Sequence, residues 1–577
     1  MTVSEYIFQF LCKKGCKEVF MVSGSSAMWL TDALYRNKEL KAICCHHEQA
    51  AAMAADGYGR VNSVPGAALV TIGPGATNAI TGVAQAYLDS SPMFVISGQA
   101  NSRLLEYAQR TGIRQQGCQS INLQPMVEPI TKYFAAVMNA DDIPQIMEDA
   151  YYKCMEGRRG PVWIDVPVNI QNCQVSECAI ENVSPREFSK LEMDLDIVRM
   201  VATRLEGAKQ PLILAGYGIR SANAVEELEC LSKEYSIPVV TSRAGIDVVD
   251  SNSPLFVGRP GSYGDRASHF AIQEADFLLI LGSRLSISTI GYYPDRFGKN
   301  AYKVMVDIDD KELAKEDVPV DYKIKADLKL WLDALLKQMS RKGKYEDWNQ
   351  HCKQNREKYP TVLSSYADEK PLNEYYVTDI ISQYTSDNTN IVVDTGSVCN
   401  IVSQSWKIKK GQRYLISGGL SCMGFWATAL GVKQENRNVI AIAGDGSVQM
   451  NIQEFATLKY NEIPVKLFIY NNNGYMLIRH NQHNYMNDRF LGVGPDSGLE
   501  TPDFCKVATA YGVQSVRIES KDEMEKKIKE VLEAKEPVVC EIICQSFAPI
   551  VPRIASRVMP DGSLKAAEFE DLYPFLD

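Results

Sequence analysis

The chain lacks features that would place it among zinc-binding, membrane or secreted proteins. It has 6 histidines and 15 cysteines in 577 residues, and no cysteines at the paired CxxC spacing of a zinc site. No apolar run approaches the roughly 18 residues of a membrane span. Residues 1–5 show neither the basic start nor the hydrophobic segment of a secretory signal. We therefore expect a cytoplasmic protein whose free thiols act as small core residues.

An excess of positive charge is also missing. The formal net charge is −10 at pH 7, and no basic block offsets it, which argues against nucleic acid as a partner. What is present is the composition of an ordinary globular protein, with 45% hydrophobic and 23% charged residues. A chain of this length can form three or four domains with large buried cores.

Short apolar runs alternate with helical segments along most of the chain, which predicts an α/β fold. The run 66–72, for example, ends at a glycine turn, Gly73-Pro74-Gly75, that opens the next expected helix. The pattern predicts three doubly wound parallel-sheet domains and a C-terminal tail that is too irregular for a core element. The expected ranges are 1–172, 190–340 and 370–546 for the domains and 547–577 for the tail.

The most informative segment is the sequence GDGS at 444–447, because Asn472 follows Asp445 after 27 residues. Each motif ends an apolar run, 438–443 for the first and 465–470 for the second. In a parallel sheet these side chains meet at the carboxyl edge. A carboxylate, an amide and backbone carbonyls suit Mg²⁺, and the glycines leave room for a diphosphate. The segment predicts a Mg²⁺–diphosphate clamp, although Gly-Asp-Gly alone is also a turn sequence.

With a strand before it and paired asparagines at 471–472, the motif resembles the signature of the thiamine-diphosphate (ThDP) enzymes. The stretch 444–472 is similar to the acetolactate synthase large-subunit group, and the resemblance spans essentially the whole chain. It implies a pyrimidine-binding first domain, a middle domain and a diphosphate-binding third domain, with the first and third sharing one fold. The cofactor of such enzymes lies between subunits, which implies a homodimer at least, and a homotetramer is common in the group.

The resemblance also implies roles for individual residues. Glu48, where an expected strand turns into a helix, matches the glutamate that hydrogen-bonds N1′ of the aminopyrimidine and controls its tautomer. An acid in a first helical turn is otherwise ordinary. Gln119 matches a glutamine of the substrate cavity; a polar loop residue is the alternative. The matching Mg²⁺ ligands are Asp445, Asn472 and the carbonyl of Gly474. The expected ThDP contacts are Glu48, Gly75, Asn78, Ser397, Met423, Gly446, Ser447, Asn472, Gly474, Tyr475 and Met476.

Several positions depart from the acetolactate synthase pattern. Where that pattern has a tryptophan, a phenylalanine and a Gln-His pair, this sequence has Asn481, Cys118 and Ser397-Val398. Loss of bulky groups widens a pocket and makes it more polar, so we expect a larger polar carbonyl acceptor in place of a second pyruvate. In the middle domain, residues 282–288 replace an Arg-Phe-Asp-Asp-Arg segment that helps hold FAD, which puts FAD in doubt.

The expected function is a ThDP- and Mg²⁺-dependent carboligase, a lyase or transferase. It decarboxylates a 2-keto acid, with pyruvate as the first choice, and transfers the acyl carbanion to a carbonyl acceptor. A 2-keto acid decarboxylase and a C–C bond hydrolase are the alternatives within the family. A non-catalytic regulatory subunit is disfavoured because Glu48, Asp445 and Asn472 are all present. A nicotinamide oxidoreductase is weaker still, since no convincing glycine fingerprint is followed by a ribose-binding acid. The expected partners are small molecules, with no nucleic acid and no membrane.

Overall fold

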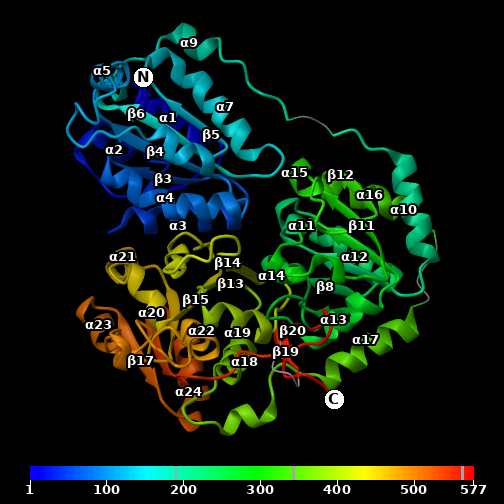
Figure 1. The fold of residues 1–577 in the computed structure, drawn as a ribbon. Helices are drawn as coiled ribbons and strands as arrows, with labels where there is room; N and C mark the ends of the chain where they lie inside the picture. Colours follow the sequence, from blue (N-terminus) through cyan, green and yellow to red (C-terminus); the bar gives the residue numbers. More distant parts are fainter. Residues whose placement is uncertain (189–190, 341–344, 560–563, 577) are drawn as a thin grey trace.

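The computed structural model describes residues 1–188, 191–340, 345–559 and 564–576. Within these ranges the chain forms three six-stranded sheets and one two-stranded sheet near the C-terminus. Every neighbouring pair in the six-stranded sheets is parallel. Figure 1 shows one domain around each six-stranded sheet, with the middle domain (green) beside the first and third domains. The predicted fold class is confirmed, and each sheet falls within one of the three predicted ranges.

The first domain has its strands in the order β2-β1-β3-β4-β6-β5. The strands are β1 (Glu18–Met21), β2 (Lys41–Cys44), β3 (Gly66–Val70), β4 (Met93–Gln99), β5 (Tyr133–Ala136) and β6 (Pro161–Pro167). Its helices are α1 (Val3–Lys13), α2 (Met28–Arg36), α3 (Glu48–Asn62), α4 (Pro74–Leu88), α5 (Ser102–Thr111), α6 (Gln124–Val127), α7 (Ile143–Met155), α8 (Val168–Gln171) and α9 (Glu177–Glu181). The strands β3, β4 and β6 are buried along their whole length, as expected of apolar runs covered on both faces.

The third domain repeats this topology, with the order β14-β13-β15-β16-β18-β17. The strands are β13 (Thr389–Val393), β14 (Arg413–Ile416), β15 (Asn438–Gly444), β16 (Val465–Asn471), β17 (Gln514–Ile518) and β18 (Val538–Ile543). Its helices are α18 (Glu374–Tyr384), α19 (Ser397–Ser405), α20 (Asp445–Val448), α21 (Glu454–Tyr460), α22 (Met476–Met486), α23 (Phe504–Ala510) and α24 (Lys521–Glu533), with a 3₁₀ segment, η7, at Phe425–Leu430. Counted in chain order, its strands have the same sheet order as those of the first domain, so the shared fold is confirmed.

The middle domain has a different order, β12-β11-β10-β7-β8-β9. The strands are β7 (Pro211–Ala215), β8 (Val239–Thr241), β9 (Phe256–Gly258), β10 (Phe277–Leu281), β11 (Tyr302–Asp307) and β12 (Tyr322–Lys325). Its helices are α10 (Leu195–Gly207), α11 (Tyr217–Ser221), α12 (Val225–Tyr235), α13 (Arg266–Glu274), α14 (Ile287–Ile290), α15 (Asp310–Leu313), α16 (Leu328–Gln338) and α17 (Glu346–Lys358). The strand order reverses between β7 and β10, and such a switch point opens a crevice beyond the carboxyl ends of the strands.

Small residues allow the first and third domains to pack closely at α3. A Cβ at Gly57 would lie 2.6 Å from the carbonyl oxygen of Thr428, and one at Gly431 would lie 1.8 Å from that of Ala54. These distances leave no room for a side chain, so both glycines are required by the close approach of the two backbones. Helix α3 and η7 are therefore held rigidly together, and Glu48 is the first residue of that helix.

The tail is more ordered than the sequence predicts. It forms the antiparallel pair β19 (Ser556–Val558) and β20 (Leu564–Ala566), and it runs from the third domain to α13 of the middle domain (Figure 1). Phe569 belongs to the apolar core of the middle domain, and Leu572 is 0% exposed. The expectation that the tail makes no contribution to a core is therefore wrong, because Phe569 packs into the core of the middle domain.

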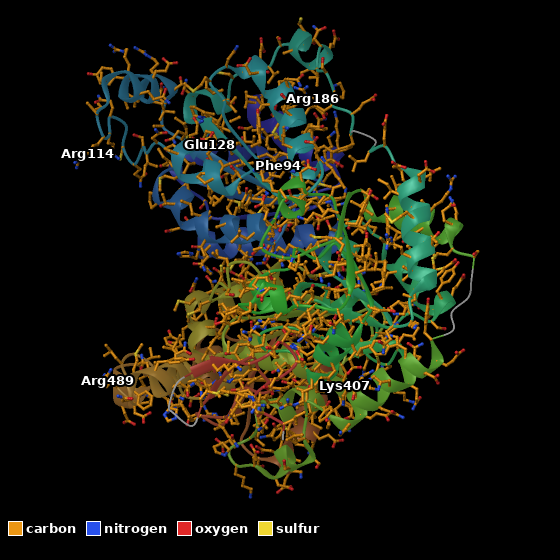
Figure 2. The ribbon with its side chains drawn as sticks, turned by 45° about the vertical axis from the view of Figure 1, so that its right-hand side comes forward. Phe94, Arg114, Glu128, Arg186, Lys407 and Arg489 are labelled. Atoms are coloured by element: carbon orange, nitrogen blue, oxygen red, sulfur yellow. The ribbon has the colours of Figure 1, made fainter. Side chains whose placement is uncertain are left out.

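Labelled side chains show the inside and the edges of the domains. Figure 2 shows Phe94 inside the first domain, whereas Arg114 and Arg489 lie at the outer edges of the first and third domains. Among the described residues, no helix combines the length and the apolar character that crossing a membrane requires.

Candidate active site

Glu48 begins α3 directly after β2, at the carboxyl edge of the first sheet. Its side chain is buried, and its Oε2 accepts a hydrogen bond of 3.0 Å from the Nδ2 of Asn78 on α4. A Cβ at Gly75 would lie 3.3 Å from Glu48 Oε1, so the absence of a side chain there keeps the second carboxylate oxygen accessible. The structure thus brings together three of the residues predicted at the pyrimidine end.

Gln119 lies beside this group. Its side chain is exposed, and its backbone has a φ of +59°, a conformation that non-glycine residues seldom adopt. Its carbonyl oxygen would lie 2.4 Å from a Cβ on Gly73, in the turn that precedes Gly75. The structure places Gln119 next to the turn that leads to Gly75, and its role at the substrate cavity stays a prediction.

Asp445 begins α20 directly after β15 in the third domain. Its Oδ1 accepts a hydrogen bond of 2.9 Å from the N–H of Gly446, and its Oδ2 accepts one of 2.8 Å from the N–H of Gly474. Burial raises the pKa of Asp445 to about 7, against the opposing effect of these two donors. A bound cation would favour the charged carboxylate.

Asn472 follows β16, and its side chain is 2% exposed. Its Nδ2 donates a hydrogen bond of 3.0 Å to Oε1 of Glu374, the first residue of α18. The Oδ1 of Asn472 has no hydrogen-bond partner among the described residues, and neither has Oε2 of Glu374. Burial raises the pKa of Glu374 to about 8, and the charge of Asp445 adds to this shift. An unpartnered buried amide oxygen beside two buried carboxyl groups is a donor set that fits Mg²⁺.

The loop after Asn472 is held in a conformation that requires glycine. Gly474 has a φ of +128°, and a Cβ there would lie 2.1 Å from the carbonyl oxygen of Val493. Arg479 on α22 donates hydrogen bonds to the carbonyl oxygens of Asn473 and Val493, at 2.7 and 2.8 Å. These contacts fix the segment whose carbonyl is expected to bind the metal.

Two further predicted cofactor contacts, Ser397 and Ser447, are serines of the third domain with different surroundings. Ser397 is buried at the start of α19, and a Cβ on Gly444 would lie 3.5 Å from the neighbouring Val398, so this helix starts beside the Asp445 motif. The hydroxyl oxygen of Ser447 accepts a hydrogen bond of 2.9 Å from the N–H of Gly424. Ser447 also bonds to the buried Asp394, so its side chain is already engaged in the fold.

Tyr475 and Met476 point in different directions. The ring of Tyr475 covers Gly446, where a Cβ would lie 2.1 Å from the ring carbon Cε1. Met476 is 1% exposed and belongs to an apolar cluster with Tyr375 and Ile401. The Met476 side chain is therefore part of the core, which leaves its backbone as the part that could reach a cofactor.

Direct contacts join the first and third domains of the chain next to Glu48. Gln49 Nε2, next to Glu48, donates a hydrogen bond of 3.4 Å to the carbonyl oxygen of Met423, and the N–H of His46 donates one of 3.0 Å to Glu454 Oε1. The half-buried Met423 therefore lies at the boundary of the first and third domains. Of the positions that depart from the acetolactate synthase pattern, Cys118 is exposed in the loop before Gln119.

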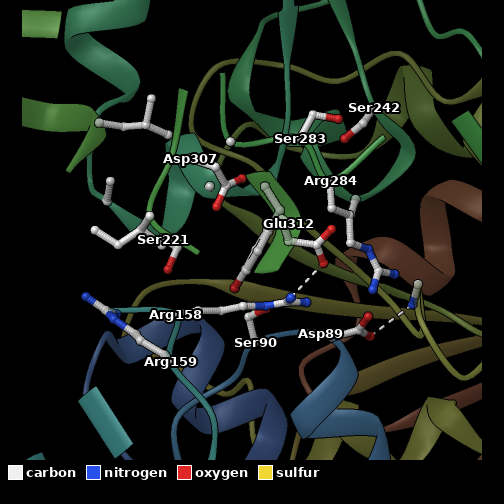
Figure 3. A pocket seen from close by; sticks show the side chains of 18 of the residues that line it. Asp89, Ser90, Arg158, Arg159, Ser221, Ser242, Ser283, Arg284, Asp307 and Glu312 are labelled. Atoms are coloured by element: carbon white, nitrogen blue, oxygen red, sulfur yellow. Dashed lines mark hydrogen bonds and ion pairs between the residues drawn. The ribbon is translucent and has the colours of Figure 1, made fainter. Parts of the chain in front are cut away.

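A cavity of about 660 Å³ lies beyond the carboxyl edge of the middle sheet, where all three domains meet. Ser242, Ser283 and Asp307 come from the middle domain (Figure 3). The first domain contributes Arg158, whose Nη1 pairs with Glu312 at 2.8 Å. Further arginines of the lining are Arg60, Arg159, Arg243, Arg284 and Arg413. Segment 282–288, which replaces the expected FAD-binding sequence, contributes several of the lining residues. Arg60, Arg158 and Arg413 are paired with carboxylates. The size of the cavity and the other three arginines suit an anionic ligand of nucleotide size.

Sequence reasoning missed two residues that shape the metal site, Glu374 and Arg479. Glu374 precedes Asp445 by 71 positions in a segment that reads as an ordinary helix start, and only the tertiary fold brings it to Asn472. Arg479 is a half-buried residue of α22. Its short spacing from Asn473 is the one signal that could have indicated a contact with the loop carbonyls.

Comparison with known families agrees with this arrangement. Three family models match in chain order: the thiamine pyrophosphate enzyme N-terminal TPP binding domain at residues 1–124, the central domain at 198–335, and the C-terminal TPP binding domain at 394–542. The acetolactate synthase large subunit of Lactococcus lactis is 32% identical over 97% of this chain and 95% of its own. A probable acetolactate synthase large subunit of Methanocaldococcus jannaschii is 31% identical over 100% and 99%, and the isozyme 1 large subunit of Escherichia coli is 29% identical over 96% of each.

Proposed function

Because the chain belongs to the ThDP-dependent enzymes, among the relatives of acetolactate synthase large subunits, we propose that it is a Mg²⁺-dependent carboligase acting on a 2-keto acid. Pyruvate is the proposed donor, and a carbonyl compound larger and more polar than pyruvate is the proposed acceptor. The observation that carries the proposal is that the chain has both a buried Glu48 group at the carboxyl edge of its first sheet and a buried Asp445–Asn472 group at that of its third.

Bound ThDP would supply the carbanion chemistry of decarboxylation and ligation. The part of this chain is to bind and orient the cofactor. Asn78 holds Oε2 of Glu48, so Oε1 is the atom left to exchange a proton with the aminopyrimidine N1′. Gly75 keeps that oxygen uncovered, and Met423 offers a large apolar surface at the domain boundary. The Gln119 side chain is exposed next to this group and would contact the substrate.

Mg²⁺ would be held by Asp445, by Oδ1 of Asn472 and by the carbonyl of Gly474. The unpartnered Oδ1 supports this assignment, because a buried acceptor without a donor is costly unless a ligand or water completes it. The diphosphate would complete the coordination, with Ser397, Gly446 and Ser447 beside it. Since Ser447 already bonds within the fold, we propose that its backbone makes the contact.

The dependence of CO₂ release on a carbonyl acceptor distinguishes the proposed ligation from simple decarboxylation and from C–C hydrolysis. With ThDP and Mg²⁺ present, CO₂ release from pyruvate is measured without acceptor and with a panel of aldehydes, ketones and keto sugars, and products are identified by NMR. Release that rises with one polar acceptor, with a new C–C bond in the product, supports ligation. Release of free aldehyde at the same rate without acceptor means a decarboxylase. Formation of acetolactate from pyruvate alone, at the rate of an acetolactate synthase, contradicts the proposed acceptor.

For the middle-domain cavity we propose an anionic ligand of nucleotide size and no requirement for FAD. Arg159, Arg243 and Arg284 of the lining support the anion, whereas the segment that helps hold FAD in acetolactate synthases is replaced by residues 282–288. Absorption spectra of the purified protein, with thermal shifts on adding ADP or FAD, test the proposal. A bound flavin band whose removal abolishes CO₂ release contradicts it.

We also propose that the active enzyme is a homodimer or homotetramer whose sites combine the first domain of one subunit with the third domain of another. Light scattering during size-exclusion chromatography tests the assembly. Mixing the variants Glu48→Gln and Asp445→Ala tests the shared site, because subunits that exchange would form one intact site from two inactive proteins. Full activity of a monomer contradicts the proposal.

A further inference from the structure

Glu374 occupies a position where an acid is normally solvated. It is the first residue of α18, after the N-cap Asn373, whose side chain accepts a hydrogen bond of 2.9 Å from the N–H of Tyr375. An acid in a first helical turn gains from the helix dipole, and such acids usually face water. Glu374 is 0% exposed instead, so the dipole alone does not explain why a carboxylate stands there.

The contact that Glu374 does make is with the expected Mg²⁺ ligand. Its Oε1 lies 3.0 Å from Nδ2 of Asn472, and both partners are buried. The remaining oxygen of each group, Oε2 of Glu374 and Oδ1 of Asn472, has no partner among the described residues. Two neighbouring side chains that each keep one unpartnered oxygen form a place where a cation or its bound water would satisfy both.

We propose that Glu374 is a positioning residue for Mg²⁺ that acts through Asn472. Oε1 of Glu374 accepts the hydrogen bond from Nδ2 of Asn472, so it holds the Asn472 amide with its NH₂ group turned toward Glu374. That orientation leaves Oδ1 as the atom available to the metal. Without Glu374 the side-chain amide of Asn472 could rotate by half a turn and present its NH₂ group to the metal. An amide NH₂ group does not ligate a cation. The inference rests on the proposed Mg²⁺ site.

The surroundings hold Glu374 in place. One turn along α18, Thr378 Oγ1 lies 2.9 Å from the hydroxyl of Tyr470 on β16, two residues before Asn472. On the other side, the N–H of Gln545 donates a hydrogen bond of 3.2 Å to the carbonyl oxygen of Leu372. Helix α18 is therefore bonded to β16, and the segment before it is bonded to the segment after β18, so Glu374 is held close to Asn472.

Four variants distinguish a positioning role of Glu374 at the metal site from a purely structural role. E374A removes the acceptor, E374D keeps the charge but shortens the side chain, and E374Q keeps an oxygen acceptor. T378V is the matched control, because it removes a buried polar contact between the same helix and the same strand without touching the Asn472 side chain. Mn²⁺, a spectroscopic substitute for Mg²⁺, is titrated by EPR into each ThDP-saturated protein, and thermal unfolding of the metal-free proteins reports the fold.

E374A is expected to bind Mn²⁺ about 10- to 100-fold more weakly than wild type, the usual effect of losing a partner that orients a ligand. E374D is expected to weaken binding similarly, whereas E374Q stays within about threefold of wild type, as does T378V. Wild-type affinity in folded E374A overturns the inference. So does a loss in T378V as large as in E374A. Failure of the wild type itself to bind Mn²⁺ would instead contradict the proposed metal site, so the two failures are distinguishable.

Discussion

His269 offers a sharp test of how the tail is held, because it is buried as a neutral ring between the tail and the middle domain. Its Nδ1 lies 2.6 Å from the carbonyl oxygen of Phe569, and Gly261 N–H donates to its Nε2 at 3.1 Å. The ring also stacks on Phe569, with 4.0 Å between centroids. One neutral tautomer satisfies both hydrogen bonds, with Nδ1 donating and Nε2 accepting. Protonation would remove the acceptor of the Gly261 N–H and turn Nε2 toward the Gly261 carbonyl oxygen, which lies 3.1 Å away. The main cost of protonation is therefore the burial of a charge.

Burial lowers the pKa of His269 from 6.5 to about 4. His269 binds a proton below about pH 6.5 in the unfolded chain but only below about pH 4 in the folded chain. The stability of the folded chain therefore falls as the pH falls through this window. The full difference between the folded and unfolded pKa of His269 corresponds to about 3.4 kcal/mol of unfolding free energy. About 2.5 kcal/mol of this stability is lost between pH 7.5 and 4.5. Above pH 7.5 the residue contributes no pH dependence.

The perturbation is H269Q, since glutamine supplies an NH₂ donor and an oxygen acceptor but does not titrate. Pulsed hydrogen exchange with mass spectrometry across urea titrations at pH 7.5 and 4.5 follows the unfolding of α13 and the tail apart from the other domains. Wild type should lose about 2.5 kcal/mol more than H269Q between the two pH values. Equal pH dependence of the two proteins would refute the argument that a neutral buried His269 anchors the tail.

Two further substitutions test the site itself. Gly474→Ala forces a Cβ to within 2.1 Å of the Val493 carbonyl oxygen at a φ of +128°, so ThDP-dependent metal binding, measured by EPR with Mn²⁺, should weaken at least about tenfold; unchanged affinity would show that the loop does not carry a ligand. Asn78→Ala removes the donor to Glu48 and should lower the rate of CO₂ release about tenfold with ThDP still bound; an unaltered rate would mean that Glu48 needs no orientation by Asn78.

The sequence predicts the strands of the site well because a short run of neighbouring apolar residues is enough to indicate a buried strand. The apolar run 465–470 corresponds to β16 at Val465–Asn471, and the run 438–443 to β15 at Asn438–Gly444. The carboxyl edge of a parallel sheet then dictates that the residues after both strands meet, and Asp445 does accept a hydrogen bond from Gly474. The prediction of a helix beginning at Glu48 holds for the same reason, since α3 continues the apolar spacing to Asn62.

What the sequence could not show depends on contacts between distant segments. Nothing near Glu374 marks it, because a helix start with an asparagine cap looks the same whether the acid faces water or Asn472. The engaged hydroxyl of Ser447 is hidden in the same way, since its partner Gly424 lies before β15. The irregular sequence of the tail does not show where the tail lies, because its place is decided by the contact of Phe569 with the middle-domain core.

The most direct test of the central claim compares CO₂ release from pyruvate by wild type and Glu48→Gln, each saturated with ThDP and Mg²⁺ and supplied with the acceptor panel. If Glu48 controls the proton at the aminopyrimidine, wild type releases CO₂ while the variant binds ThDP and works at least about 100-fold more slowly. Equal rates, or no turnover of pyruvate or any other 2-keto acid by wild type with bound cofactor, would contradict the account and favour a non-catalytic subunit.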